Sequence, residues 1–486
     1  MKDQPNATGV AHDAQAEAVE YCRDVYGGTL AVRNKRTKYL PMFPMETPAG
    51  YAARLAGAVL FNGMRRTVKG LSGMVFRKDP TLSDEVPELV QEHSENIDQA
   101  GRSLPVFAKD CFDNQLIDGQ THIFVDMPQV DAGRVRTLED ERNARLRPYW
   151  INILKMQVLR FRTRNENGRP VLVNFAYHEC TTEEDGTYGE KEVERVRIYN
   201  LVDGPDGKRS VQYHVWKRDK KAAASGEWQP EVTGGTMSIS RIPLTTAYSD
   251  RTGFMTSNPP LLDLAIENIG HYQVRSDRRN SLHIAGVPIP IFTGLDDDDK
   301  ITVSVEKGIR LPVGGDAKYL EPTGAALEQM REELRDTEQR MAALGLAMLQ
   351  RDTRAAETAE ARRIDASESQ SSLSTAARSH EGALNEALSF HAEWLDQGAD
   401  AGGKCEVNRD FEDQTMAPEM ITALSNMVAQ GQLSVDTLWD RMQKGEILPD
   451  DFDTENEKKL IAEQGMREIK AALDAGARKP APAPAA

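Results

Sequence analysis

The sequence is poor in cysteine and aromatic residues and has no long hydrophobic run. Its four cysteines, Cys22, Cys111, Cys180 and Cys405, stand far apart without a CxxC pair. This excludes a disulfide framework and a zinc knuckle and indicates reduced, buried thiols. No apolar run approaches the ~18 residues that span a bilayer. Residues 1–20 lack the apolar core of a signal peptide, so we expect a protein that starts in a cytoplasm.

Positive charge is also in deficit. The chain of 486 residues holds 60 Lys and Arg against 76 Asp and Glu, a net charge of −16. Such a chain repels polyanions, which excludes a strong nonspecific nucleic-acid binder and restricts any DNA contact to local or weak ones. The length is enough for about three domains.

Catalytic motifs are missing as well. The sequence contains no GxxxxGK[ST] phosphate loop, no HExxH and no GxSxG. His178 and Cys180 alternate on an expected strand, but a metal site would need two further ligands, so we interpret the pair as packing residues. We therefore expect no enzyme, no cofactor and no metal.

The first half of the chain predicts an α+β domain. Residues 1–25 are polar and are expected to form a flexible arm. Apolar spacing predicts one helix over 47–76, with Thr47 as its N-cap and Pro48 in its first turn. Alternating stretches such as "THIFVDMP" and "VERVRIYNLV" predict strands, and the domain ends near residue 256.

Two long helices bracket a small insert in the second half. The signal "SNPP" starts a helix over 257–286, and Gly and Pro bound a β-type insert over 287–324. A second helix over 325–350 has apolar residues at strict 3-4 spacing, with Thr337 the one exception. Two helices flanking a compact insert are expected to pack as an antiparallel pair.

A charged interruption follows over 351–363, without the glycine or proline of a turn. Its arginines Arg351, Arg354, Arg362 and Arg363 alternate with acids, so the segment is nearly neutral and cannot act as a tight DNA clamp. A solvent-facing segment is the ordinary interpretation of such a run. Helix is expected again over 364–402.

The C-terminal part over 403–475 predicts a strand near "CEVNRDFE" followed by helices. Ser434 is an expected helix cap, and Thr454 and Glu457 form a candidate capping box. The last segment, 476–486, is a Pro/Ala tail that cannot bury a core and is expected to be disordered.

Two charged clusters are candidate binding residues. The tip Asp296, Asp297, Asp298, Asp299 and Lys300 lacks the frame of a calcium loop, so it is either a solvated turn or a docking surface. The helix residues Arg275, Arg278 and Arg279 could contact phosphate, or could equally pair with glutamates of the 325–350 helix.

The sequence resembles the portal proteins, or head-to-tail connectors, of tailed bacteriophages. Four stretches carry the resemblance, in this order: "YLPMFPMETPAGYAARLAGAVLFNGMRRTVKGLSGMVFRKDP", "PPLLDLAIENIGHYQVRSDRRNSLHIAGVPIPIF", "AKYLEPTGAALEQMREELRDTEQRMAALGLAML" and "LSVDTLWDRMQKGEIL". They span roughly residues 35 to 465, and the branch they most resemble is often described only as phage protein of unknown function.

The resemblance implies names for the parts. Residues 26–256 would be an α/β wing, 257–286 and 325–350 the two stem helices, and 287–324 the clip. Residues 351–363 would be the tunnel loop, 364–402 a long kinked wing helix, and 403–475 a strand return and helical crown. Within the tunnel loop, the residues facing DNA would be Arg351, Thr353, Arg354, Arg362 and Arg363.

The resemblance also implies a function. The chain would form a ring, a homododecamer, that serves as a DNA channel at one capsid vertex for genome packaging, retention and ejection. Its partners would be copies of itself, double-stranded DNA, a terminase, the major capsid and scaffolding proteins, and a head-completion or tail adaptor protein. It would reside in the virion and, during assembly, in the host cytoplasm. The alternative from another class is a helical scaffold or adaptor without a DNA channel, and an unrecognised enzyme site in the α+β domain is a weaker one.

Overall fold

The computed structural model describes residues 4–128, 146–204, 207–219, 227–285, 289–293, 316–320, 325–349, 371–409, 418–444, 447–448 and 452–464. The fold is α+β, as the sequence predicts. Two compact units divide the chain, Met1–Asp410 and Phe411–Ala486, and each is described by itself.

The first unit begins with helix α1 (Val10–Gly27), where the sequence predicts a flexible arm. Val19, Cys22 and Val25 are fully buried along one side of this helix. The prediction was wrong for residues 10–25, because three apolar residues at helical spacing are enough to fix a helix whose composition is otherwise polar.

Two short helices replace the single helix expected over 47–76. They are α3 (Pro48–Gly57) and α4 (Gly63–Val75), and they follow α2 (Thr29–Asn34) and the 3-10 turn η1 (Arg36–Lys38). Thr47 caps α3 as predicted, since its side chain accepts a hydrogen bond from the Gly50 N–H.

The break between α3 and α4 is held by a residue far away in the sequence. Asn268 donates its Nδ2 to the Phe61 carbonyl at 2.6 Å and accepts the Met64 N–H at 3.1 Å. These tertiary bonds satisfy backbone groups that a continuous helix would have satisfied internally. The apolar spacing within 47–76 could not reveal such a partner.

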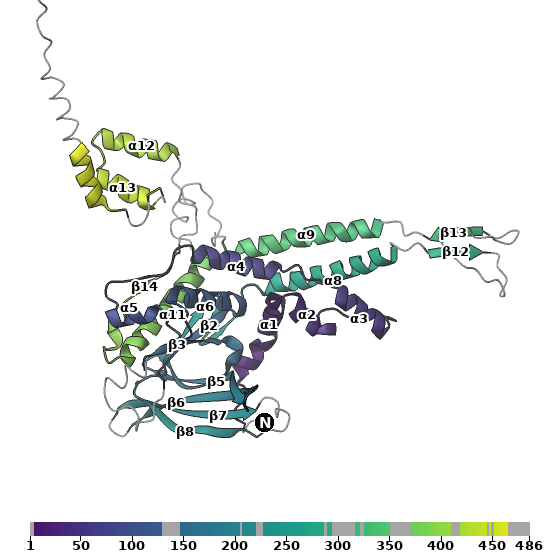
Figure 1. Cartoon of the computed structure of the whole chain (residues 1–486), viewed down its shortest axis with the longest axis horizontal. Helices are drawn as coiled ribbons and strands as arrows, with labels where there is room; N and C mark the ends of the chain where they lie inside the picture. Colours follow the sequence, from purple (N-terminus) through teal and green to yellow (C-terminus); the bar gives the residue numbers. More distant parts are fainter. Residues whose placement is uncertain are drawn as a thin grey trace, which may run out of the picture. The chain divides into compact units, whose positions relative to one another are not determined.

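A three-stranded antiparallel sheet forms the centre of the first unit, in the order β3-β2-β9. Its strands are β2 (Gln120–Asp126), β3 (Tyr149–Leu154) and β9 (Leu244–Tyr248). Helices α6 (Leu104–Asp118) and α11 (Ser372–Trp394) contact it (Figure 1). Every residue of β2 is buried, because the Phe124 ring faces a second sheet and stacks on Phe175.

That second sheet is a five-stranded meander in the order β4-β5-β6-β7-β8. Its strands are β4 (Val158–Glu166), β5 (Arg169–Asp185), β6 (Gly189–Asp203), β7 (Arg209–Asp219) and β8 (Gln229–Met237). Leu159, Val196 and Trp228 form its own small core. The 3-10 turn η2 (Lys155–Gln157) joins β3 to β4.

Short elements complete the body of this unit. Helix α5 (Glu88–Ser94) contacts α11, and β10 (Arg251–Gly253) pairs with β11 (Thr256–Ser257). After α11 come the 3-10 turn η4 (Ala399–Gly402) and β14 (Cys405–Glu406), which pairs with β1 (Thr81–Leu82). The strand expected at "CEVNRDFE" is therefore present, and the described part of the helix expected over 364–402 ends at Trp394.

Two long helices pack against each other in the ranges where the sequence predicts a pair. They are α8 (Leu262–Ala285) and α9 (Ala325–Ala347). Between them in the chain, β12 (Ile289–Thr293) pairs with β13 (Asp316–Leu320) as an antiparallel hairpin. Thr337 is buried in the predicted stripe, and its hydroxyl donates to the Glu333 carbonyl at 2.8 Å, which explains how the stripe tolerates a polar residue.

The second unit is helical in its described part. It contains α12 (Pro418–Ala429), α13 (Val435–Lys444) and a helix over 454–464. Ser434 caps α13 as predicted, with its Oγ accepting the Thr437 N–H at 3.2 Å. The last helix is capped by Asp453, whose Oδ1 accepts the Asn456 N–H at 2.9 Å, so the capping box predicted at Thr454 was wrong by one residue.

Candidate functional site

The predicted phosphate-contacting arginines lie on α8. Arg279 is exposed and donates its Nη1 to the Gly57 carbonyl at 2.8 Å. Arg275 is exposed, and the Nε of Arg278 is buried without a hydrogen-bond partner. Among the described residues none of the three forms an ion pair, so their charge is not neutralised by glutamates of α9.

The predicted tunnel-loop residues Arg351, Thr353, Arg354, Arg362 and Arg363 lie outside the described residues. The two described ends of this segment, however, meet. The Leu373 N–H donates to the Met348 carbonyl at 3.0 Å, and the Ser371 side chain caps α11 by accepting the Ser374 N–H at 3.2 Å. The end of α9 and the start of α11 therefore lie side by side.

The predicted clip-docking residues Asp296, Asp297, Asp298, Asp299 and Lys300 also lie outside the described residues. They fall between Thr293 and Asp316, the last residues paired across the hairpin of β12 and β13. The register of that hairpin is continuous from Ile289 opposite Leu320 to this pair.

A buried charged network, which no local sequence pattern predicts, joins α1, α6 and η2. Arg23 on α1 donates two bonds of 2.6 Å to the carboxylate of Asp118 at the end of α6. Lys155 on η2 donates its Nζ to the Asp118 carbonyl at 3.0 Å and to the Ser257 carbonyl at 2.6 Å. Burial lowers the pKa of Lys155 to about 8. Because the Lys155 amine donates hydrogen bonds to two backbone carbonyls, this lysine links η2 to the end of α6 and to β11.

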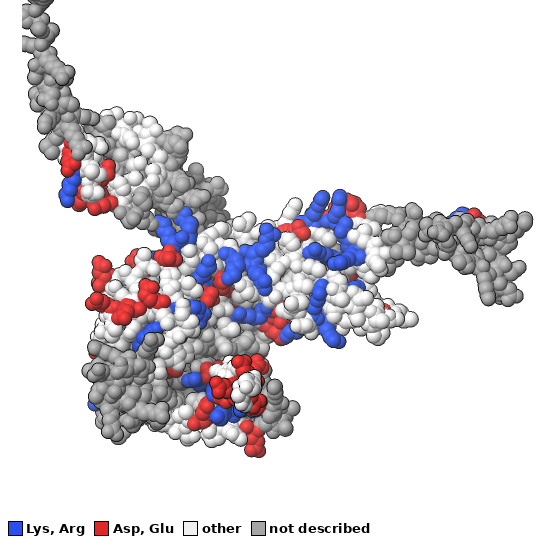
Figure 2. Space-filling view, viewed as in Figure 1, with Lys and Arg blue, Asp and Glu red and all other residues white. Residues whose placement is uncertain are grey.

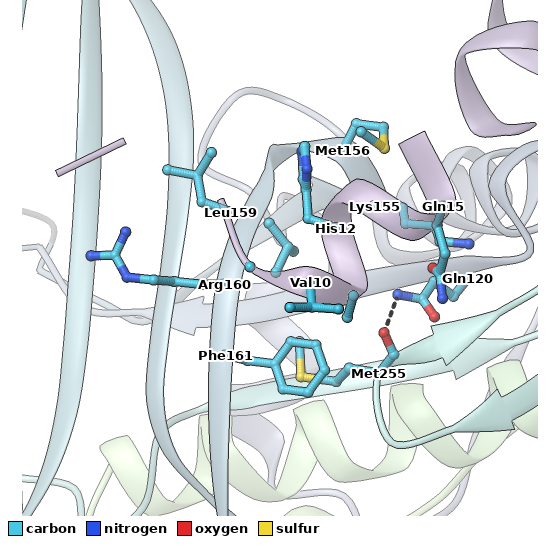
Figure 3. Close-up of a pocket in the computed structure, with 13 residues that line it drawn as sticks. Val10, His12, Gln15, Gln120, Lys155, Met156, Leu159, Arg160, Phe161 and Met255 are labelled. Atoms are coloured by element: carbon cyan, nitrogen blue, oxygen red, sulfur yellow. Dashed lines mark hydrogen bonds between the residues drawn. The ribbon is translucent and has the colours of Figure 1, made fainter. Parts of the chain in front are cut away.

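Lys155 also lines a cavity of about 240 Å³ beside the start of α1 (Figure 3). Val10, Phe161 and Met255 form apolar walls, and the Gln120 amide donates to the Met255 carbonyl at 2.9 Å. The Gln120 Oε1 is buried without a partner. His12 also lines the cavity, and its Nδ1 lies 3.2 Å from Asp13 Oδ1.

A second buried polar group links α5, α11 and β3. His391 Nδ1 accepts the Trp150 indole N–H at 3.2 Å, and its Nε2 lies 2.9 Å from His93 Nδ1. Because an indole can only donate, neutral His391 carries its proton on Nε2 and donates it to His93. Burial lowers the pKa of His391 to about 3. The sequence indicated only that His391 belongs to the buried stripe of its helix.

The described part of the chain shows neither a metal-binding cluster nor a membrane-spanning helix. No three His, Cys, Asp or Glu side chains there are grouped to hold a metal ion. No helix within the same residues is long and apolar enough to cross a membrane.

Comparison with known proteins adds one family match. The family described as a domain of unknown function, DUF4055, matches residues 260–395. This range holds α8, the hairpin, α9 and α11 and leaves both large sheets outside it. No curated protein matches the chain.

Solved structures similar to the chain at low identity include parts of gene transfer agent (GTA) particles. The neck of an empty GTA particle computed with C6 symmetry is 13% identical, with a TM-score of 0.38 over 77% of this chain and 86% of that chain. The virion of a native gene transfer agent (GTA) particle is 13% identical, with a TM-score of 0.35 over 83% and 94%. The neck of a native GTA particle computed with C12 symmetry is 12% identical, with a TM-score of 0.37 over 84% and 97%.

Proposed function

We propose that this chain is the subunit of a ring-shaped portal of a tailed bacteriophage. The ring is a DNA channel at one capsid vertex and the attachment point of the tail, and the subunit itself catalyses no reaction. The support is the resemblance of four ordered sequence stretches to portal proteins, together with a packed pair of long helices, α8 and α9, in the ranges that the resemblance names as the stem.

The return of the chain at Met348 and Leu373 is the observation that carries the proposal. It brings the described residues on either side of the segment 350–370 together, at the end of α9 and the start of α11. We propose that the segment between these two points, which lies outside the described residues, is the tunnel loop that the resemblance implies. In a ring it is the segment suited to contact DNA, through Arg351, Thr353, Arg354, Arg362 and Arg363.

The remaining charged candidates take separate roles in this proposal. Arg275, Arg278 and Arg279 on α8 are candidate phosphate contacts, since no carboxylate neutralises them within the described residues. The acidic residues Asp296 to Asp299 are a candidate docking surface for a terminase or an adaptor protein. DNA contacts of an acidic ring are weak and short-lived, which suits a channel through which DNA slides.

Negative-stain electron microscopy and light scattering of the purified chain test the proposal. We expect closed rings, whereas a stable monomer of 54 kDa at micromolar concentration contradicts a portal and favours a scaffold or adaptor without a channel. A variant with Arg351→Ala and Arg354→Ala should form rings but package or retain less DNA.

The matched control for that variant replaces Arg164 and Arg209 by alanine. Both arginines are exposed on the five-stranded sheet, so this change removes equal charge and should leave packaging unchanged. Loss of ring formation in the variant of Arg351 and Arg354 would show that the segment is part of the packed structure and would contradict its assignment as a loop.

A further inference from the structure

The net charge of the chain hides two neighbouring segments of opposite sign. Residues 29–78 contain ten Lys and Arg and a single Glu, a net charge of +9. Residues 79–98 contain seven Asp and Glu and no Lys or Arg, a net charge of −7. Lys and Arg gather over α4 and the long helices, and Asp and Glu over the part of the first unit that contains α5 (Figure 2).

Hydrogen bonds within the basic segment hold α2 against the junction of α3 and α4. Arg65 donates its Nη2 to the Gly27 carbonyl at 3.0 Å, and Thr29 accepts the Leu60 N–H at 3.2 Å. Arg33 donates its Nε to the Ala58 carbonyl at 2.8 Å. These bonds tie α2 along the junction of α3 and α4. We call Arg33, Arg36, Arg65 and Arg66 the basic face.

The charge of the basic face is not neutralised. Arg33 and Arg65 bond only to backbone carbonyls, and within the described residues Arg36 and Arg66 form no ion pair. Arg66 lies over the Phe61 ring at 5.8 Å. Arg36, Arg65 and Arg66 are exposed, so the face is available to an acidic partner.

An apolar loop over residues 41–46 follows η1, which carries Arg36 of the basic face. Arg54 is 2% exposed and holds this loop by donating to the Glu46 carboxylate at 2.8 Å and to the Pro41 carbonyl at 2.6 Å. Met45 is 99% exposed and has a φ of 68°, a left-handed conformation that side chains other than glycine rarely adopt. Such a fixed, exposed methionine is suited to fill an apolar depression on a partner.

The acidic segment forms a second surface around α5. We call its six exposed acids the acidic face: Asp79, Asp84, Glu85, Glu88, Glu92 and Glu95. None of them forms an ion pair with a described residue, although Arg and Lys pair with acids elsewhere in the first unit. Leu89, 41% exposed, lies among them.

We propose that the basic face and the 41–46 loop of one copy dock against the acidic face of the next copy. Both faces belong to one chain but to different elements, so a single contact between copies satisfies both of them at once. A DNA partner would account for the basic face and leave the acidic face unexplained. Two unlike surfaces on one subunit give a head-to-tail contact, which closes into a ring when the rotation allows it. This inference rests on the proposed ring function.

Charge reversal on each face tests the contact in the full-length chain. One variant carries Arg36→Glu and Arg66→Glu, and the other carries Glu85→Arg and Glu92→Arg. None of these four side chains makes a hydrogen bond in the described structure, so we expect circular dichroism to show both variants folded. Each variant alone should require at least about tenfold higher concentration to assemble, most clearly at low salt. An equimolar mixture should assemble again, because each variant then presents charges opposite to those of the other.

The matched control is Glu184→Arg with Glu190→Arg. These exposed acids lie opposite each other on β5 and β6, so the net charge changes as in the acidic-face variant without touching either face. The control should assemble like the unmodified chain. If the unmodified chain forms rings and both face variants do so equally well, the interface is refuted while the ring function stands. If the unmodified chain stays monomeric, the ring function itself fails.

Binding of each variant to a short double-stranded DNA tests the alternative that the basic face contacts DNA and not a neighbouring copy. Normal assembly of the Arg36 and Arg66 variant with weakened DNA binding would assign the basic face to DNA and overturn the inference. Loss of assembly that the mixture does not restore would also overturn it, because the two faces would then have different partners.

Discussion

Removal of Arg23 is the most direct measure of how the buried network stabilises the first unit. The Asp118 carboxylate has 1% exposure and receives both bonds of the Arg23 guanidinium at 2.6 Å. Leaving one partner of such a buried pair uncompensated costs about 3–5 kcal/mol. We therefore expect Arg23→Met, which keeps the apolar stem of the side chain, to lower the free energy of unfolding by about this amount. Urea denaturation followed by circular dichroism measures it.

The pH dependence of that loss tests its cause. Burial raises the pKa of Asp118, and Arg23 opposes the rise, so the variant should have a still higher folded pKa. A folded pKa above the unfolded value of 3.8 means that the folded state takes up the proton first. Stability is then regained as the pH falls through the folded pKa. The deficit of Arg23→Met should shrink in acid.

The control for this measurement is Arg164→Met. Arg164 pairs with Glu166 and Asp203 on the surface of the five-stranded sheet, so its removal should change stability little. A deficit of Arg23→Met equal to that of the control, or one that does not shrink as the pH falls from neutral toward the unfolded pKa of 3.8, would refute the account of an uncompensated buried carboxylate.

Two further predictions concern the centre of the first unit. Gly119 has a φ of 84°, and an added Cβ would clash with the Asn258 carbonyl oxygen. Gly101 has a φ of 96° but open space around it, so Gly101→Ala should cost only the backbone strain of about 1–3 kcal/mol. Gly119→Ala should destabilise the chain by more than this amount. Equal melting temperatures of these two variants would contradict the clash. Burial lowers the pKa of His391 to about 3 from 6.5, so the folded state binds this proton less readily than the unfolded chain and stability should fall as the pH drops below 6.5, by roughly 1.4 kcal/mol per unit. Urea titrations at several pH values should give a shallower slope for His391→Phe, and an unchanged slope would show that His391 does not contribute.

Regular periodicity was the part of the fold that could be predicted. The strict 3-4 stripe around Thr337 identified a long helix with one apolar side, and the Gly and Pro residues around 287–324 identified a separate insert between two helices. Both signals are local, because they depend on residues within a few turns of each other. The Thr47 and Ser434 caps were predictable for the same reason.

What the sequence could not reveal depends on residues that are distant in the chain. Asn268 bonds to the break in the helix expected over 47–76, and Asp118 binds Arg23 across 95 residues of the chain. Neither Asn268 nor Asp118 belongs to a local sequence pattern, so residue spacing could not predict either contact. The same distinction applies to the candidate site. Local composition identified the arginines of α8, whereas the hydrogen bond between Leu373 and Met348 is visible only in the folded structure.

The distribution of charge reconciles firm self-assembly with weak DNA contact in the proposed ring. The segments 29–78 and 79–98 carry +9 and −7, which sum to +2, so the rest of the chain carries −18 of the total −16. A contact between the basic face and the acidic face of neighbouring copies brings unpaired charges of opposite sign together, and the rest of the chain keeps the acidic surplus. That surplus repels a polyanion, and contacts between protein and DNA are then restricted to a few arginines such as Arg351 and Arg354. Strengthening the basic face should therefore tighten assembly without making the channel retain DNA, whereas removing acids elsewhere should have the opposite effect.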